Sequence, residues 1–305
     1  MDKIGKDLLK KVADLHEIPE GAYNIRENGG LGGRRTTANI DIVTKQDKPG
    51  IDIIIKENTK NESVHIPVII SKSGLDDLVY NDFYIGENAD VVIVAGCGIH
   101  NTGDEKSSHD GIHTFHVGKN AKIKYVERHY GAGDGLGENV MNPTTVIEID
   151  DGGYMEMETT QIKGIDSTLR KTTAILGNEA KLVIKESLMT HGRQYAKTDF
   201  TVDLNGENSS ANVISRSVAK DESYQEFLSI INGNNKCAGH TECDAILMDK
   251  ARVCAIPQIT ANHIDASLIH EAAIGKIAGE QLMKLMTLGL TEAEAEEQIV
   301  NGFLK

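Results

Sequence analysis

The chain has no tryptophan, and aromatic residues make up only 4% of its 305 residues. This scarcity argues against a core organised around large aromatic side chains. Valine, isoleucine, threonine, asparagine and glycine are plentiful instead, and this mixture favours short β-strands joined by tight turns. The length suffices for one large domain or for two ordinary ones.

Long apolar runs are also missing. No stretch approaches the roughly 18 consecutive apolar residues of a membrane-spanning helix, and the N-terminal segment is too charged for a signal peptide. Only four cysteines are present, so we expect a cytoplasmic protein without disulfides. Acidic residues outnumber basic ones by 46 to 32. The resulting net charge of −14 disfavours nucleic acid and anionic membranes as partners.

Nucleotide-binding motifs are absent as well. The glycine-rich segment 131–137 has Leu136 where a G-x-G-x-x-G motif requires glycine. A second glycine-rich segment, 29–35, ends in two arginines and could cradle an anion, but it lacks the residue order of a P-loop. Since the chain has no Walker A motif, any ATP hydrolysis would have to take place in another subunit.

An amphipathic helix is predicted over residues 3–15. Its apolar residues recur three or four positions apart, at Ile4, Leu8, Val12 and Leu15. The helix is expected to end near residues 19–21. From residue 36 to residue 268 helical periodicity is missing, and short runs of β-forming residues alternate with turns rich in glycine, asparagine and aspartate. These runs are 91–94, 123–126, 146–149, 182–184 and 213–215.

An internal repeat indicates the fold class. Four segments share a turn that leads into a strand: Gly86-Glu87-Asn88-Ala89, Gly118-Lys119-Asn120-Ala121, Gly177-Asn178-Glu179-Ala180 and Gly206-Glu207-Asn208. Their glycines are 32, 59 and 29 residues apart, or one, two and one units of about 30 residues. A fixed period with a strand in each unit is typical of a solenoid whose coils stack as parallel ladders. The alternative is an antiparallel sandwich with coincidentally similar turns; we favour the β-helix.

The pattern becomes helical after residue 268. A helical stripe ends at Gly289, a residue typical of the position after a helix; the stripe comprises Ile274, Ile277, Ala278, Leu282, Leu285 and Met286. Thr291 and Glu294 form a predicted capping box that opens a second helix, which closes at Gly302. We expect this two-helix tail to cap one end of the solenoid, where strand edges would otherwise be unpaired. The functional alternative is a docking surface for another protein.

Two groups of potential metal ligands stand out. The first begins with Cys97-x-x-His100 and continues with His109, His113 and His116. Cysteine and histidine are ligands of first-row metals. His113 and His116 fall within one predicted strand, however, and alternation along a strand sends them to opposite faces. They are not expected to share one metal, and exposed or core-bonded histidines are the alternative.

The second group is Cys237-x-x-His240-x-x-Cys243, followed by Cys254. Its spacing is similar to that of a zinc knuckle, but Cys254 lies in a predicted strand and not in a second tight loop. A buried, inert cysteine is the alternative. The acidic residues on both sides of Cys243 would raise the pKa of its thiol, which disfavours a simple nucleophile but not a metal ligand.

His270 and Glu271 lie 27 residues downstream of Cys243, just before the helical tail. A thiolate, an imidazole and a carboxylate near this boundary could hold a soft metal or a cluster.

At these residues the sequence resembles SufB and SufD, the core proteins of the SUF iron–sulfur cluster assembly system. The matching segments are His240-Thr-Glu-Cys243-Asp-Ala-Ile-Leu-Met, Ala266-Ser-Leu-Ile-His270-Glu271-Ala-Ala-Ile-Gly-Lys-Ile, and parts of 289–303. The resemblance continues upstream through 161–168 and 215–220, so it covers most of the chain. In length and in its short N-terminal region the chain is similar to compact SufB/SufD-type proteins of archaea and anaerobic bacteria.

This resemblance implies a mainly β protein: a right-handed parallel β-helix with a short N-terminal helical segment and a C-terminal helical domain. We therefore divide the chain into an N-terminal helix with a glycine-rich linker (1–35), a β-helix core (36–268) and a helical domain for ATPase docking (269–305). The resemblance further implies a complex with SufC, an ABC-type ATPase that docks on the C-terminal helices. It also implies dimerisation through the β-helices, with the nascent cluster at the dimer interface.

The resemblance assigns roles residue by residue. Cys243 matches the SufB cysteine considered to accept sulfur and to ligate the cluster, and His270 and Glu271 match proposed cluster ligands. SufD commonly has glycine at the position of Glu271, so the chain is more similar to SufB. SufB usually has an acidic residue just before this histidine, whereas the chain has Ile269, so one proposed ligand is lost. Cys97 matches no functional position of the family, and neither does Cys254.

The leading hypothesis is a scaffold for a transient iron–sulfur cluster of the 4Fe–4S type, not itself an enzyme, which uses ATP only through its partner. One thiolate with labile nitrogen and oxygen ligands suits a cluster that must be released. Expected partners are a SufC-like ATPase, a second copy or a SufB/SufD-type paralogue, a sulfur donor and apo-protein acceptors. The alternatives are a β-helical metal-binding enzyme using Cys97, His100 and His109, and a SufD-like structural subunit.

Overall fold

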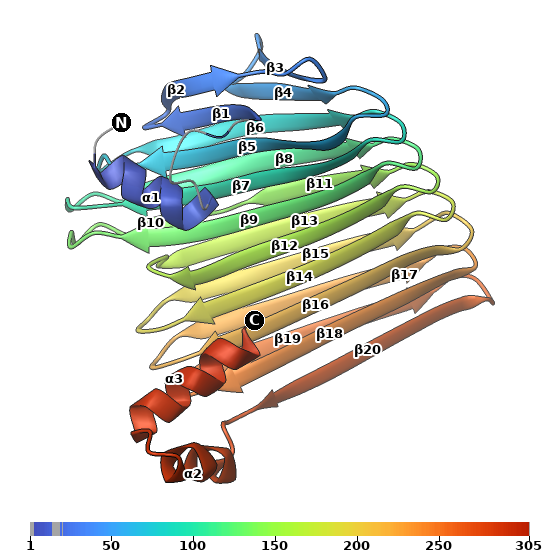
Figure 1. Cartoon of the computed structure of the whole chain (residues 1–305). Helices are drawn as coiled ribbons and strands as arrows, with labels where there is room; N and C mark the ends of the chain where they lie inside the picture. The colour runs from blue at the N-terminus through green and yellow to red at the C-terminus, as the bar shows by residue number, and fades with distance from the viewer. Residues whose placement is uncertain (1–2, 14–18, 20, 305) are drawn as a thin grey trace.

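The fold is a two-sided β-solenoid, seen in a computed structural model that describes residues 3–13, 19 and 21–304. Two sheets of ten strands face each other over about eight turns, and three short helices lie near the termini (Figure 1). The chain passes from one sheet to the other, so neighbouring strands of a sheet come from successive coils. The predicted β-helix is therefore confirmed, and the sandwich alternative is wrong.

Sheet A is the sheet that ends with β20. In spatial order its strands are β2 (Gly30–Arg35), β1 (Ala22–Glu27), β5 (Lys60–Ile70), β7 (Asp90–His100), β9 (Lys122–Ala132), β12 (Tyr154–Lys163), β14 (Lys181–Thr190), β16 (Ser209–Ala219), β18 (Cys237–Leu247) and β20 (Ala266–Gly275). Strands β1 and β2 pair antiparallel, and from β1 to β20 the successive neighbours run parallel.

Sheet B is the sheet that ends with β19. Its strands are β19 (Arg252–Ala261), β17 (Tyr224–Gly233), β15 (Tyr195–Leu204), β13 (Ser167–Leu176), β10 (Asn139–Met141) with β11 (Thr144–Ile149), β8 (Ser107–Val117), β6 (Asp76–Ile85), β4 (Gly50–Ile55) and β3 (Ile40–Thr44). Here β3 and β4 pair antiparallel. The short antiparallel pairs of both sheets therefore lie at the N-terminal end of the solenoid.

The repeated turns adopt the conformation that their composition favours. At their third position φ is positive, with 58° at Asn88, 54° at Asn120, 56° at Glu179 and 57° at Asn208. Asparagine tolerates this left-handed conformation better than most residues. The 59-residue gap in the repeat contains one more coil, whose turn has Gly152 at φ 70°. The repeat thus marks successive reversals of the chain at one end of the coils.

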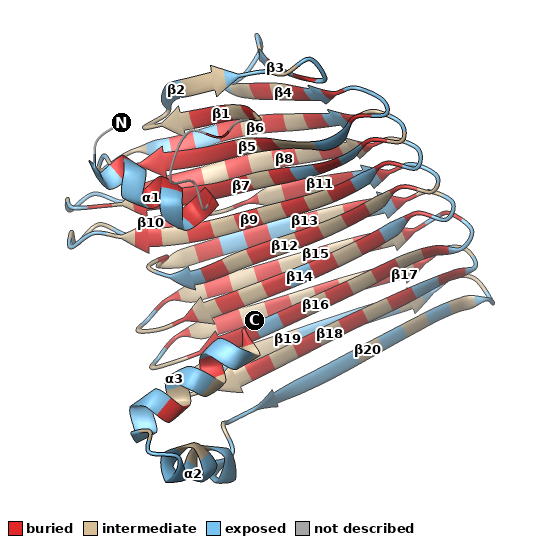
Figure 2. Cartoon of the chain, viewed as in Figure 1, coloured by how far each residue is buried: buried red, intermediate tan, exposed pale blue. Residues whose placement is uncertain are grey.

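The hydrophobic core lies between the sheets, where alternate residues of each strand point inward (Figure 2). Aliphatic side chains fill most of it. Three aromatic rings contact one another in it: Phe83 and Phe115 stack across coils with centroids 4.3 Å apart, and Tyr125 of the facing sheet meets Phe115 edge-on at 4.8 Å. A solenoid needs few aromatic anchors because each coil packs mainly on its two neighbours.

Helix α1 (Lys3–Ala13) covers the outer face of sheet A. Leu8 and Val12 are buried against β7, where Gly96 and Gly98 leave space: a Cβ on Gly96 would lie 2.9 Å from the Val12 Cβ. The predicted helix is confirmed over residues 3–13, and its last two residues, 14 and 15, lie outside the described residues.

The C-terminal tail forms helices α2 (Gly279–Thr287) and α3 (Glu292–Phe303). The predicted capping box is present: Thr291 accepts a hydrogen bond from the Glu294 N–H, and the Glu294 carboxylate accepts one from the Thr291 N–H. Gly289 has φ 98°, as expected after a helix. None of the described helices is long and apolar enough to cross a membrane.

The tail does not cap the solenoid, and that prediction is wrong. Val300 and Leu304 pack on Val218 of β16, at the side of sheet A, and the Leu304 carbonyl accepts a hydrogen bond from Ser187 of β14 at 2.9 Å. Apolar side chains at these strand ends thus bind the end of helix α3 at the side of the sheet. Strands β19 and β20 remain largely exposed (Figure 2).

The strands extend beyond the range 36–268. Strands β1 and β2 precede residue 36, and β20 continues to Gly275. The glycine-rich segment is therefore mostly strand β2, and His270 and Glu271 belong to the last strand of sheet A and not to the helical tail.

Candidate cluster and metal site

Cys243 lies on strand β18 with its thiol directed into the solenoid. The residue is 1% exposed and belongs to the hydrophobic core. In the parallel register of sheet A it lies between Ser215 of β16 and Ala272 of β20. Because β20 is the last strand, one coil separates Cys243 from the open end of the sheet.

A row of buried charged groups leads along the interior toward Cys243. Arg170 Nη1 donates a hydrogen bond to Glu127 Oε2 at 2.6 Å, and its Nε lies 3.7 Å from Glu186 Oε1. Glu186 also accepts hydrogen bonds from the hydroxyls of Ser215, at 2.7 Å, and of Thr198, at 2.8 Å. Ser215 is the register neighbour of Cys243, so one hydroxyl connects the ionic row to the position next to the thiol.

This environment keeps the Cys243 thiol protonated. Burial, followed by the negative charges of Glu186 and Asp244, raises its pKa to about 12. The prediction that flanking acids raise the pKa is confirmed for Asp244, although burial is the larger cause. A metal ligand must be deprotonated, so binding of iron would have to displace this proton.

His270 occupies the same inner side of sheet A as Cys243. It is the register partner of Thr241, which is fully buried. Its Nδ1 is buried and has no hydrogen-bond partner among the described residues. Burial lowers the pKa of His270, which favours the neutral imidazole that binds metals. A buried imidazole nitrogen without a hydrogen-bond partner among the described residues therefore lies near the open end, one strand beyond Cys243.

Glu271 points the other way. It pairs with Glu242 on the outer face of sheet A, and its side chain is 67% exposed. The structure therefore places two of the three predicted cluster ligands, Cys243 and His270, on the same side of sheet A, and it places Glu271 on the other side.

The outer face carries a ligand group that was not identified from the sequence. One ligand atom each from His240, Glu242 and Glu271 lies within 4.8 Å of the other two, and this is the one such group among the described residues. His240 and Glu242 are two residues apart on β18, and their side chains therefore lie on the same face of the sheet. The two-residue spacing of His240 and Glu242 could have been recognised in the sequence. The third residue of the group, Glu271, could be identified only from the pairing of β18 with β20.

The comparison with protein families assigns the chain. The family of the SUF system FeS cluster assembly SufBD core domain matches residues 80–303. The chain belongs to this family. Membership supports a role in iron–sulfur cluster assembly, and it confirms the resemblance seen around Cys243.

Individual relatives of this SufBD chain cover most of it. The iron–sulfur cluster assembly SufBD family protein of Methanocaldococcus jannaschii is 31% identical over 255 residues, which are 83% of this chain and 79% of the relative. A SufBD family protein of Methanothermobacter thermautotrophicus is 34% identical over 72% of this chain and 53% of the relative. A SufBD family protein of Archaeoglobus fulgidus is 30% identical over 74% of this chain and 60% of the relative. The chain thus spans little more than half of these last two relatives.

The other predicted ligands of this SufBD chain are dispersed. Cys97 is buried on the inner side of β7 and lines a cavity of about 10 Å³ with His109, His113 and His129, but not with His100. Burial raises the pKa of the Cys97 thiol. Three residues on, His100 lies on the opposite side of the strand. Cys97 and His100 therefore do not form a ligand pair in this structure.

The histidines of β8 separate as predicted. His113 is buried and its Nδ1 lies 2.8 Å from the Tyr125 hydroxyl. His116 is on the outside, 2.8 Å from Glu148 Oε2.

The zinc-knuckle arrangement is absent too. Cys237 and Cys243 point inward while His240 points outward, and Cys254 belongs to the other sheet.

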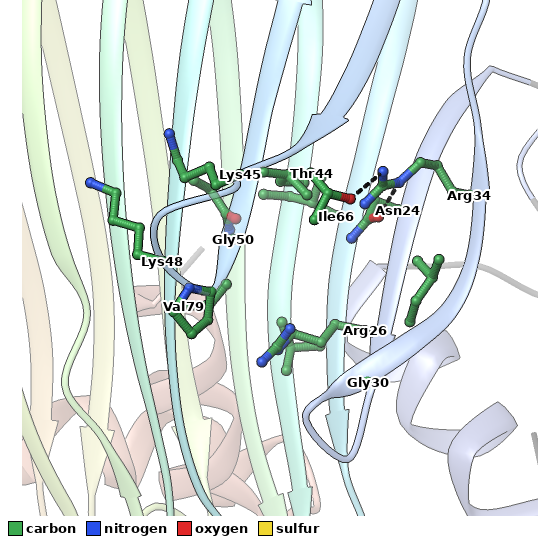
Figure 3. A pocket seen from close by; sticks show the side chains of 15 residues that line it. Asn24, Arg26, Gly30, Arg34, Thr44, Lys45, Lys48, Gly50, Ile66 and Val79 are labelled. Atoms are coloured by element: carbon green, nitrogen blue, oxygen red, sulfur yellow. Dashed lines mark hydrogen bonds between the residues drawn. The ribbon is translucent and has the colours of Figure 1, made fainter.

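The glycine-rich segment borders a cavity of about 240 Å³ at the N-terminal end (Figure 3). Its cationic side chains have partners inside the protein. Arg26 pairs with Asp77 at 2.6 Å, and Lys45 pairs with Asp82 at 2.7 Å and with Asp52. Arg34 donates to Asn24 and Thr44, each at 2.8 Å. Carboxylates thus compensate the charges of Arg26 and Lys45, whereas Arg34 binds neutral partners and Lys48 lies over the Tyr80 ring.

Proposed function

We propose that this SufBD chain is a scaffold on which a transient 4Fe–4S cluster is assembled at Cys243 and His270, with ATP hydrolysed by a SufC-type partner. The observation that carries this proposal is the shared inner side of the two residues on the last two strands of sheet A. The buried Nδ1 of His270, which has no partner among the residues that the structure describes, supports it further, because a buried polar atom without a partner is costly unless a ligand satisfies it.

The donor set suits a cluster that is built and then passed on. Thiolate is the strongest protein ligand for iron–sulfur clusters, and imidazole is a weaker one. A chain that offers one thiol and one imidazole holds the cluster less firmly than four thiolates would. The raised pKa of Cys243 adds a further requirement, since the thiol must lose its proton as the cluster forms.

The open end of the solenoid supports dimerisation with a second copy. Ile259 of β19 pairs with Ile231, and Ile274 of β20 pairs with Ala245. Ile231 and Ala245 are buried in the core, so the side chains of their two partners are on the inner side of the sheets as well. Nevertheless, Ile259 is 44% exposed and Ile274 is 41% exposed. A partner at this end would pair the free strand edges, cover these side chains and place a second Cys243 near the first.

Helix α2 supports the docking of an ATPase. Among its described residues none is buried, and Met283, Met286 and the following Leu288 are exposed. Exposed apolar groups that lie close together on one helix are typical of a protein-binding surface.

The cluster hypothesis is tested by anaerobic reconstitution with ferrous iron, sulfide and the ATPase, followed by visible and Mössbauer spectroscopy. We expect the wild-type chain to give a cluster spectrum that Cys243→Ser greatly weakens. Cys254→Ser, which removes a half-buried cysteine of the other sheet, is the matched control and should retain the spectrum. An unchanged spectrum in Cys243→Ser would contradict the proposal.

The dimer is tested by light scattering of Ile259→Asp. We expect this variant to have half the mass of the wild-type particle, whereas Ile175→Asp, on the outer face in the middle of the solenoid, should not change the mass. If the homodimer alone reconstitutes a cluster, the SufD-like structural alternative is excluded; a requirement for a second SufB-type chain would favour it.

A further inference from the structure

We propose that His240, Glu242 and Glu271 form a ferrous-iron site on the outer face of sheet A, separate from the cluster position on the inner side. The choice of iron rests on the proposed scaffold function, whereas the geometry of the site does not depend on it. The three residues come from the last two strands of the sheet, directly behind Cys243 and His270.

The backbone register places the ligands together. His240 and Glu242 are two residues apart on β18, so both project outward. Glu271 of β20 lies opposite Glu242 in the parallel pairing. One ligand atom from each residue lies within 4.8 Å of the others. Ligands of one ion at about 2.1 Å lie up to about 4.2 Å apart, so small rotations of these side chains complete the site.

The imidazole of His240 has the orientation of a metal ligand. Its Nδ1 lies 2.9 Å from Asn212 Oδ1 on the neighbouring strand β16. An amide oxygen only accepts hydrogen bonds, so Nδ1 carries the proton and Nε2 is left with its lone pair. Metal-binding histidines are commonly oriented in this way by a hydrogen bond from the other ring nitrogen.

The free nitrogen faces a carboxylate. Nε2 of His240 lies 3.6 Å from Glu271 Oε2. Two electron-pair donors at this separation repel each other unless a cation or a second ring proton lies between them. Asp244 adds another carboxylate on the same face of β18, two residues from Glu242. A divalent cation would satisfy the imidazole and offset the charge of the carboxylates together.

The donor set defines the class of metal. One imidazole and two carboxylates, with open positions toward solvent, suit Fe²⁺, Mn²⁺ and Zn²⁺, whereas Cu⁺ prefers thiolates and Mg²⁺ and Ca²⁺ prefer oxygen alone. A weak solvent-facing site one residue from Cys243 is suited to holding ferrous iron before it is incorporated on the other side of the strand.

The test is metal binding by the full-length apo chain without sulfide or ATPase. Mn²⁺ serves as a paramagnetic probe and Fe²⁺ is titrated anaerobically by calorimetry. We expect one site per chain that His240→Ala or Glu242→Gln weakens at least 10-fold, and that Asn212→Ala weakens about 10-fold through loss of the ring orientation. Far-ultraviolet circular dichroism checks that these surface variants keep the fold.

Two control variants show whether the bound metal occupies these three ligands. Glu148→Gln removes the carboxylate of the His116–Glu148 pair, an outer-face imidazole–carboxylate contact of 2.8 Å to which the described residues add no third ligand, and should leave metal binding unchanged. Cys243→Ser should also leave it unchanged. Binding that is absent from the wild type, equal in His240→Ala, or lost in Cys243→Ser would overturn the proposal. If cluster formation does not depend on Cys243 but this binding persists, the scaffold proposal fails and the iron site stands.

Discussion

Cys243 and Glu271 lie on adjacent strands of one sheet and point to opposite faces of it. Cys243 is the register partner of Ala272, and Glu271 is the partner of Glu242. The thiol is therefore enclosed in the core while the carboxylate is in solvent. Within one chain these two groups do not bind the same ion, so chemistry that uses both requires either movement of β20 or a second copy of the protein.

The first prediction concerns the reactivity of Cys243. We expect iodoacetamide to label it much more slowly than Cys254 in the folded protein at mildly alkaline pH, because the thiolate is the nucleophile and the pKa of Cys243 is raised to about 12. Time-resolved mass spectrometry measures both rates. In urea the two cysteines should react alike; similar rates in the folded protein would contradict the buried, protonated thiol.

The second prediction concerns the buried ionic row. Arg170→Met should lower the free energy of unfolding by about 3–5 kcal/mol, because Glu127 and Glu186 remain buried without their cation. Urea denaturation measures the change. Lys185→Met, which removes a partly exposed pair with Glu156 at 2.7 Å, is the control and should cost less than about 1 kcal/mol. A similar small cost for Arg170→Met would show that the interior is hydrated.

A third prediction follows from the repeated turns. Glu179 has φ 56° at the position where the turns at Asn88, Asn120 and Asn208 have asparagine, and a left-handed backbone costs most residues about 1–2 kcal/mol. Glu179→Asn should raise the melting temperature, and Asn120→Ala, at the equivalent turn, should lower it. Differential scanning calorimetry of the two variants compares the same backbone position in two coils. Shifts of the opposite sign would mean that side-chain contacts outweigh the backbone preference.

The fourth prediction is a pH dependence of stability. Complete burial lowers the pKa of His113 from 6.5 to about 4. Between these values the unfolded chain binds the proton and the folded chain does not, so stability falls as the pH decreases from 6.5 to 4. The contribution amounts to about 3 kcal/mol.

His113→Gln should reduce this decline, as measured by urea denaturation at a series of pH values. His116→Gln, on the exposed side of the same strand, should leave the decline as it is. Equal slopes for all three proteins would show that burial does not lower the pKa of His113.

Much of the fold could be predicted from the sequence because its determinants are local. The left-handed turn residues such as Asn120, the capping box at Thr291 and the terminating Gly289 each specify a conformation within a few residues. The position of the helical tail could not be predicted, because its partner surface around Val218 is assembled from several coils.

Only part of the candidate site could be predicted from the sequence, for the same reason. Cys243, His270 and Glu271 could be found from their chemistry and from the family resemblance. Their division between two faces depends on which residue of β18 lies opposite which residue of β20, and coils of unequal length hide this register. Ile269, where a proposed ligand is lost, lies opposite His240, so the ligand that we propose on the neighbouring strand lies at the same level.

Strand β20 is hydrogen-bonded to β18 on one side, and on its other side it has no neighbouring strand among the described residues. The free energy needed to detach a strand is smallest where a single ladder holds it. Detachment of β20 exposes the Cys243 thiol to water while the preceding coils stay folded, and water lowers the cost of forming the thiolate. We therefore expect the exposure of the Cys243 thiol to follow the local unfolding of the ten residues of β20, which amide hydrogen exchange in this strand measures directly.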